Sequence, residues 1–538
     1  MTDDEKQTRN RLSWARVALG ACSGVLAGAV SLGVAELVSA AVRPQASPVV
    51  AVGGAAIDRT PAGVKDWAIR HFGTNDKLVL QLGILAMLTL FALVLGMVAV
   101  RFRRGGAAGV LLFGVVGAVS ATSRPDSTSL SDALPSVVGA LAGAGVLYLL
   151  VGRLTRRAPS AEPVGDEPKD PSSGEGWDRR GFVIAATAAA AASAGAGVLG
   201  RALNSASGQN AVASRDRIVL PRPTSAAAPV PRGAQLRIPG ISAFTTPNNS
   251  FYRVDTALVV PKVNATTWRL RIHGMGVRRP LTLSFDDLLR RELIERDITL
   301  TCVSNEVGGP YVGNARWIGV RLADLLAECG VKPPSKGGSA DQLVARSVDG
   351  MTIGSPVEDV MDGRDALLAL GMNGEPLPFA HGFPVRMVVP GLYGFVSACK
   401  WIKDIELTTF DSYDPYWVKR GWARQAPIKT ESRIDTPKPF ARPGAGTVMV
   451  GGVAWAQHRG IDKVEVRVDD GPWREARLAA EDTRDTWRQW SFPWEAVKGG
   501  HTLTVRATDG TGRVQTDKRT QTIPDGASGW HSVVVTVD

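Results

Sequence analysis

The stretch Leu300-Thr301-Cys302-Val303-Ser304-Asn305 decides the fold of the second half of this chain. Ile298 and Leu300 belong to an apolar run that predicts a strand, and this strand delivers the thiol of Cys302 to the start of a polar loop. Glycine makes that loop irregular, and a regular amphipathic pattern, typical of a helix, resumes only over residues 320–326. A cysteine at a strand end beside an irregular loop can meet a ligand that a mid-strand cysteine cannot reach.

The bulk composition limits the classes of function. The 538 residues suffice for about three to four domains. Lys and Arg number 62 against 51 Asp and Glu, a net charge of +11, but these basic residues are scattered, which excludes a nucleic acid as partner. The cysteines form no CxxC or CxxCH motif, so we expect no zinc site, no haem attachment and no disulfide framework. They are Cys22, Cys302, Cys329 and Cys399.

Long apolar runs with almost no internal charge fill much of the first 155 residues. Crossing the apolar core of a bilayer takes roughly 20 such residues, a length that each run approaches. The sequence therefore predicts four membrane-spanning helices, followed by a fifth that is richer in alanine and glycine. The five runs are 17–42, 78–100, about 107–121, 134–151 and 181–200.

Basic residues gather at one end of the predicted spans. The positive-inside rule keeps such clusters in the cytoplasm, together with the Pro/Glu/Ser-rich linker at about 158–177. The fifth span then runs outward, so we expect a multi-pass protein of the cytoplasmic membrane whose residues after about 201 are extracytoplasmic. The clusters are Lys6, Arg9, Arg11 and Arg16; Arg101, Arg103 and Arg104; and Arg153, Arg156 and Arg157.

The fifth span begins with Arg179-Arg180, and a twin-arginine pair before a weakly apolar helix resembles a twin-arginine export signal. A cytoplasmic anchor is the alternative explanation, because arginines also hold ordinary membrane helices in place. No haem is expected in this chain, since none of the six histidines lies within a span. We therefore expect the four-span bundle to serve as an anchor or a docking surface.

After a Pro/Ala/Ser-rich tether, the chain alternates short strands with short helices, which indicates an α+β domain. The pattern predicts a strand over 268–274 and helices over 285–293 and 322–329. No GxGxxG motif follows a strand, so a nicotinamide or flavin Rossmann site is excluded. From Gly446 onward, short strands separated by turns predict a β-sandwich. Its predicted strands are 447–450, 461–468, 487–492, 501–508 and 533–537.

Three further blocks accompany the cysteine block in a fixed order: residues 374–378, residues 381–386 and Lys400-Trp401. Together the blocks resemble the sulfite oxidase family of molybdenum-cofactor enzymes over roughly residues 235–538. The resemblance implies a multi-domain protein with an all-α transmembrane bundle, an α+β sulfite-oxidase-like molybdopterin domain and an immunoglobulin-like β-sandwich that dimerises. The expected domains are 1–155 with four spans, 156–235 with linker, fifth span and tether, 236–428 with the molybdopterin site, and 429–538 with the sandwich.

The same resemblance implies the site residues. Cys302 matches the cysteine that ligates molybdenum, a role that suits a soft thiolate. His381 and Arg386, five residues apart across Gly-Phe-Pro, match a cofactor-binding pair. The other expected contacts to the molybdopterin are Asn249, Tyr252, Arg253, Asp349, Ser397 and Lys400.

Two departures from the family pattern bear on the substrate. Glu306-Val307 stand where sulfite oxidases carry arginines, and no tyrosine precedes Ser355-Pro356. A carboxylate there weakens the binding of a small dianion, so a sulfoxide, an N-oxide and a sulfite-like oxyanion all stay open as substrates.

The function expected from the resemblance is oxygen-atom transfer, with electrons exchanged with a separate electron-transfer protein or a quinone-linked partner. A membrane-anchored surface receptor that keeps the fold without metal is the alternative. The presence of Cys302, His381 and Arg386 argues against that alternative, because a receptor has no use for all three.

Overall fold

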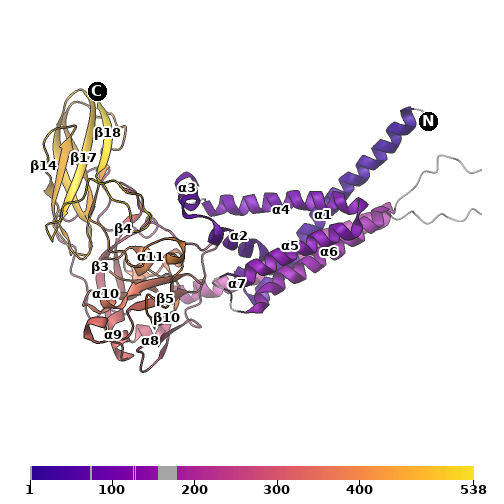
Figure 1. The fold of residues 1–538 in the computed structure, drawn as a ribbon, viewed down its shortest axis with the longest axis horizontal. Coiled ribbons are helices and arrows are strands. Elements are labelled where there is room, and N and C mark those ends of the chain that lie inside the picture. Colours follow the sequence, from indigo (N-terminus) through magenta and orange to yellow (C-terminus); the bar gives the residue numbers. More distant parts are fainter. Residues whose placement is uncertain (1–2, 73–75, 125–126, 128, 156–177) are drawn as a thin grey trace, which may run out of the picture. The chain divides into compact units, whose positions relative to one another are not determined.

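The computed structural model describes residues 3–72, 76–124, 127, 129–155 and 178–538 (Figure 1). The chain divides into two compact units: residues 1–209 with 256–259, and residues 210–255 with 260–538. The first unit is helical and the second is rich in strands. The linker predicted at about 158–177 lies outside the described residues.

The described part of the helical unit contains five stretches that are long and apolar enough to cross a membrane. Each of them includes one of the predicted runs, so the prediction of five such helices is confirmed. These stretches are Trp14–Val42, Leu78–Arg101, Arg103–Thr122, Leu130–Thr155 and Arg179–Asp216. The helices themselves are α1 (Asp3–Val42), α2 (Pro48–Arg59), α3 (Ala62–Phe72), α4 (Asp76–Arg101), α5 (Arg103–Thr122), α6 (Leu134–Thr155) and α7 (Arg179–Asp216).

Two features of this unit differ from the sequence pattern. The stretch 43–77, between the first two apolar runs, contains the short helices α2 and α3, which the apolar pattern did not predict. Helix α7 continues past residue 200, where the apolar run ends, as far as Asp216. Residues 201–216 contain no proline and are rich in alanine, so nothing breaks the helix before the Pro-rich tether begins.

Glycines allow the long helices to pack closely. A Cβ atom added to Gly24 in α1 would lie 1.9 Å from the Ala92 carbonyl oxygen in α4, and one on Gly96 would lie 2.1 Å from the Gly20 carbonyl oxygen. Gly143 of α6 approaches α1 in the same way. Such backbone contact between helices is the packing expected of membrane helices, where small residues form the interfaces.

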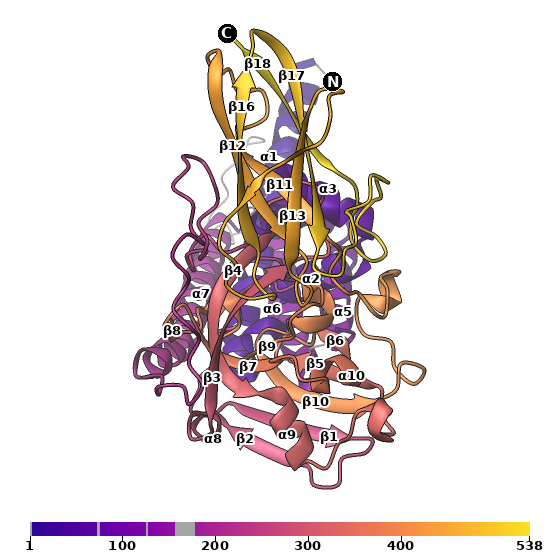
Figure 2. The ribbon, with the colours of Figure 1, turned by 90° about the vertical axis from the view of Figure 1, so that its left-hand side faces the viewer.

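The second unit contains two five-stranded sheets that position the cysteine loop (Figure 2). One sheet has the order β3-β4-β7-β8, with β9 paired to β7, and the other has the order β2-β1-β10-β5-β6. The strands are β1 (Arg269–Gly274), β2 (Leu281–Ser284), β3 (Leu293–Thr301), β4 (Val312–Arg321), β5 (Gln342–Ser347), β6 (Thr352–Pro356), β7 (Leu367–Met372), β8 (Glu375–Pro376), β9 (Arg386–Val388) and β10 (Ile402–Thr408). Short helices connect them: α8 (Phe285–Leu289), α9 (Leu322–Glu328), α10 (Val357–Met361) and α11 (Gly394–Ser397).

The predicted strand at 268–274 and the helix at 322–329 are confirmed, with ends shifted by one residue. The helix predicted over 285–293 is correct at its start, where Ser284 and Asp287 form a capping box, but it ends at Leu289. Leu293 instead opens strand β3 and pairs with Val320 of β4. Val320 likewise belongs to a strand rather than to the helix, because tertiary pairing overrides local periodicity here.

The C-terminal residues form two four-stranded sheets, β11-β12-β16-β15 and β14-β13-β17-β18, around a common apolar core. Trp490, Phe492 and Leu503 are among the buried residues of this core. All five strands predicted from Gly446 onward are present. The strands are β11 (Glu431–Thr436), β12 (Gly446–Trp455), β13 (Ile461–Val468), β14 (Arg474–Glu475), β15 (Arg477–Leu478), β16 (Arg488–Ala496), β17 (Gly499–Asp509) and β18 (His531–Val537).

Candidate functional site

Cys302 stands immediately after the last paired residue of β3, Thr301, which lies opposite Val312 of β4. The Cys302 amide donates to the Tyr311 carbonyl oxygen at 2.9 Å, and the Asn305 amide donates to the Cys302 carbonyl oxygen at 3.0 Å. Asn305 Oδ1 in turn accepts from the Tyr311 amide at 2.7 Å. The loop is therefore closed on itself, and it holds the thiol, in a residue that is 9% exposed, at the edge of the sheet.

Two tyrosines interact electrostatically with the thiol. Burial raises the pKa of both Tyr252 and Tyr393. Cys302 adds to the rise for Tyr252, whereas Glu431 adds more than Cys302 to the rise for Tyr393. Tyr252 stacks on Phe251 with ring centroids 5.2 Å apart. Both hydroxyls thus keep their protons at ordinary pH and can donate hydrogen bonds. Tyr393 was missed from the sequence, where its only signal is its place in a glycine-bounded segment just before α11.

Arg386 is a buried cation without a carboxylate partner among the described residues. Its Nη1 donates to the His381 carbonyl oxygen at 3.2 Å and its Cζ lies 4.9 Å from the centroid of the Trp317 ring, while Nε has no acceptor. Burial lowers the pKa of Arg386 to about 10, so the guanidinium stays charged. A buried charge with unused donors is costly unless an anion binds to it, and the planar guanidinium suits phosphate. The position therefore fits the phosphate of a molybdopterin.

His381 is adjacent to Arg386 and neutral. Burial, followed by the nearby Arg386 charge, lowers the pKa of His381 to about 4. Its Nε2 lies 2.9 Å from the Asn248 carbonyl oxygen. A carbonyl only accepts, so Nε2 carries the proton and Nδ1 keeps a free lone pair. Gly382 lies between His381 and Arg386 in the sequence, and its φ is +112°. A Cβ atom at this position would lie 3.0 Å from the Arg386 Cβ and 3.1 Å from the Lys400 Cβ, so only glycine fits here without a shift.

A charged cluster gathers around Asp255, which sequence reasoning missed. Lys400 Nζ donates to Asp255 Oδ2 at 2.7 Å and to the Ala380 carbonyl oxygen at 3.4 Å. Arg253 Nε donates to the same Asp255 oxygen at 2.9 Å. Asp349 lies near Asp255 and Lys400, and burial raises its pKa. The structure thus brings Arg253, Lys400 and Asp349 together, and the Arg253-x-Asp255 spacing was the available sequence signal.

The two remaining predicted residues differ in exposure. Ser397 lies in α11, and its buried hydroxyl donates to the Leu392 and Tyr393 carbonyl oxygens, each at 3.0 Å. Asn249 occupies an exposed turn, where its Oδ1 accepts from the Ser250 hydroxyl at 3.1 Å. It is the neighbouring Asn248 whose backbone meets His381.

Glu431 in β11 is a buried carboxyl that interacts with Tyr393. Its Oε2 accepts from Gln515 Nε2 at 3.3 Å, whereas Oε1 has no partner. Burial raises the pKa of Glu431 to about 8, and the nearby Lys429 and Arg519 offset only part of that rise. The side chain is therefore neutral near pH 7.

The pKa of Glu431 predicts a loss of stability with rising pH. The folded carboxyl keeps its proton up to about pH 8, whereas an unfolded one ionises near 4.5, so the folded state binds more protons between these values. Stability contributed by this group is full below about 4.5 and lost as pH rises through 8. We expect Glu431→Gln to remove most of that loss, which amounts to at most about 5 kcal/mol in total and to about 3 kcal/mol between about pH 6 and about pH 9. Thermal midpoints at about pH 6 and about pH 9 measure it, and an unchanged pH dependence in the variant contradicts it.

The chain is similar to a family of molybdopterin-binding oxidoreductases and to several sulfite oxidases. The family model described as "Oxidoreductase molybdopterin binding domain" matches residues 257–417. Mitochondrial sulfite oxidase of Mus musculus is 31% identical over 317 residues, which cover 51% of this chain and 58% of the relative. Sulfite oxidase of Gallus gallus is 31% identical over 321 residues, covering 51% of this chain and 68% of the relative.

A bacterial relative is matched over most of its own length. The uncharacterized oxidoreductase YuiH of Bacillus subtilis is 33% identical over 186 residues, which cover 35% of this chain and 86% of the relative. The chain spans little more than half the length of the mammalian relatives it matches, 58% for the mouse protein. Residues 257–417, which the family model matches, contain Cys302, His381, Arg386 and Lys400.

Proposed function

Because the chain belongs to the sulfite oxidase family of molybdopterin-dependent oxidoreductases, we propose that it is a membrane-anchored enzyme whose catalytic domain, residues 236–428, faces outside the cytoplasm. The observation that carries the proposal is the Cys302 thiol, held at the end of β3 within the same buried region as the unpaired Arg386. Residues 429–538 are then the immunoglobulin-like domain, and a homodimer through that domain is part of the proposal.

The cofactor fits the residues present. Cys302 would ligate the molybdenum, Arg386 and Lys400 would hold the phosphate, and His381 would offer its Nδ1 lone pair to a donor on the pterin edge. Asn249, Tyr252, Arg253, Asp349 and Ser397 complete the proposed contacts. When bound, the group supplies a two-electron centre that exchanges an oxygen atom with the substrate.

The proposed reaction is oxygen-atom transfer, in which substrate and water give oxidised substrate, two protons and two electrons, or the reverse. A separate electron-transfer protein or a quinone-linked partner takes or supplies the electrons. The protonated hydroxyls of Tyr252 and Tyr393 can orient an oxygen of the substrate by donating hydrogen bonds. Glu306 is exposed on the cysteine loop, and its carboxylate disfavours a small dianion. Two neutral hydrogen-bond donors together with one negative charge favour a sulfoxide or an N-oxide over sulfite.

Metal analysis combined with a dye-coupled activity screen tests the proposal. We expect about one molybdenum per chain and turnover of one of sulfite, a sulfoxide or an N-oxide with dye electron donors or acceptors. Protein purified from a molybdenum-replete host that holds no molybdenum would instead favour a surface receptor.

Topology gives a second test of the proposal. The arginine clusters at 101–104 and 153–157 would keep those ends cytoplasmic. A reporter that is active only outside the cytoplasm should be active when fused after residue 240 and inactive when fused near residue 165. The reverse pattern would show that the number of spans is wrong.

The role of Arg179-Arg180, the first two residues of α7, is tested with the same reporter. Arg179→Lys with Arg180→Lys keeps both charges, so ordinary anchoring survives. If the pair is an export signal, the fusion after residue 240 should lose its activity in the double variant. Unchanged activity would leave the pair as an anchor only.

A further inference from the structure

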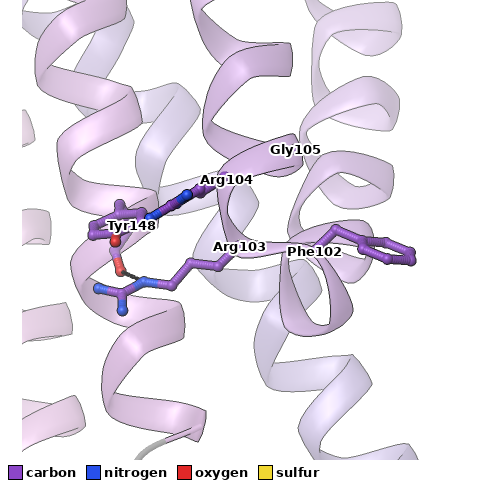
Figure 3. Close-up of a pocket in the computed structure, with 5 residues that line it drawn as sticks. All are labelled: Phe102, Arg103, Arg104, Gly105 and Tyr148. Carbon is purple, nitrogen blue, oxygen red and sulfur yellow. Dashed lines mark hydrogen bonds between the residues drawn. The ribbon is translucent and has the colours of Figure 1, made fainter.

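The connection between α4 and α5 is unusually short and strongly basic. Helix α4 ends at Arg101 and α5 begins with Arg103 and Arg104, so only Phe102 lies between the two helices (Figure 3). The Phe102 side chain is 61% exposed. Exposed apolar residues of α4, including Met97 and Val98, lie within two helical turns of it. The connection thus combines positive charge with an apolar surface.

A hollow of about 600 Å³ opens at this connection. It is lined by Phe102, Arg103, Arg104, Gly105 and, from α6, Tyr148 (Figure 3). Within it, Arg103 Nε donates to the Tyr148 carbonyl oxygen at 2.7 Å, and Arg103 Cζ lies 3.5 Å from the centroid of the Tyr148 ring. These contacts fix the guanidinium before any ligand binds, which lowers the entropy lost on binding.

Gly152 leaves the space that the guanidinium occupies. A Cβ atom added there would lie 2.4 Å from Arg103 Nη2 and 3.0 Å from Nη1. Both of these nitrogens lack an acceptor among the described residues. Two other arginines of this unit have carboxylate partners: Asp132 for Arg43 at 2.8 Å and Asp178 for Arg153 at 3.3 Å. In the described chain no carboxylate pairs with Arg101, Arg103 or Arg104.

We propose that this hollow binds the phosphate group of an anionic phospholipid, with Arg103 and Arg104 on the phosphate and Phe102 beside the acyl chains. The preorganised, unpaired guanidinium supplies donors for phosphate, and the adjoining apolar helix surface favours a lipid over free phosphate as its source. The site rests on the membrane insertion proposed above, but nothing in the catalytic chemistry requires it.

Lipid retention by the full chain tests the site. The protein is placed in nanodiscs of phosphatidylcholine alone or mixed with phosphatidylglycerol, and the lipids it retains are counted by native mass spectrometry. We expect the wild type to prefer phosphatidylglycerol by about tenfold or more, and Arg103→Gln with Arg104→Gln to abolish the preference. The matched control, Arg59→Gln with Arg201→Gln, removes the same charge elsewhere in the helical unit and should keep it.

Gly152→Ala separates a built site from a general attraction to positive charge. It keeps every arginine and favours the helix, but its methyl group displaces the Arg103 guanidinium, so the preference should fall several-fold. A wild type that binds both lipids equally, a preference that survives both variants, or saturation by inorganic phosphate alone would overturn the proposal. A chain that does not enter nanodiscs would overturn the membrane anchoring together with this site, whereas one that enters without preference overturns this site only.

Discussion

Cys302→Ser should reduce turnover to background while leaving the fold intact. A hydroxyl is too poor a donor to replace a thiolate on molybdenum, so the redox centre would lose its protein ligand. The substitution is nearly isosteric, and the backbone bonds of Cys302 with Tyr311 and Asn305 do not involve the sulfur. The thermal midpoint should therefore change by only a few degrees. Dye-coupled activity and thermal unfolding of the same preparation measure both effects.

Cys329→Ser is the matched control for this prediction. Cys329 is also buried, but it comes directly after Glu328, the last residue of α9, and lies outside the proposed site. Its substitution should leave turnover unchanged. Activity at the wild-type level in Cys302→Ser would overturn the assignment of the metal ligand, and a loss of activity in both variants would indicate a general effect of thiol removal.

Local sequence patterns predicted the strands and helices whose buried residues recur at a regular spacing or form one long apolar run. The strands of the C-terminal sandwich alternate apolar and polar residues, so their positions could be predicted closely. The apolar runs of the first unit likewise predicted the five long helices. Helix ends were less predictable, because Leu293 and Val320 join strands through pairing with partners distant in sequence.

The charge balance of the candidate site could not be read from sequence. Lys400 and Arg253 resemble solvated surface charges until the structure shows that both bind the oxygen of Asp255. Tyr393 belongs to no sequence motif, and only the structure shows that it interacts with Cys302. The resemblance to a family identified the candidate cofactor-binding residues, whereas tertiary packing decides which of their charges are already paired with a carboxylate of the chain.

Arg386 differs from those cations because no carboxylate among the described residues neutralises it, which makes its substitution informative. Arg386→Met keeps much of the volume and removes the charge. We expect the molybdenum and pterin content to fall about 100-fold or more at limiting cofactor, since charge-assisted bonds to phosphate contribute about 1.5–3 kcal/mol each. The cofactor-free variant should unfold at a higher temperature than the cofactor-free wild type, because an unpaired buried charge has been replaced by an apolar group.

The opposite signs of the two effects of Arg386→Met distinguish a ligand-binding charge from a structural one. Arg364 provides the matched control, because it is also largely buried but is paired with Asp359 at 2.9 Å and Asp362 at 2.7 Å. Arg364→Met should lower the thermal midpoint, since it leaves two carboxylates without their partner, and should not change the affinity for the cofactor. Metal analysis and thermal unfolding of both variants measure the contrast. An Arg386→Met protein that retains full molybdenum, or that is less stable than wild type without cofactor, would show that this guanidinium supports the fold rather than the phosphate.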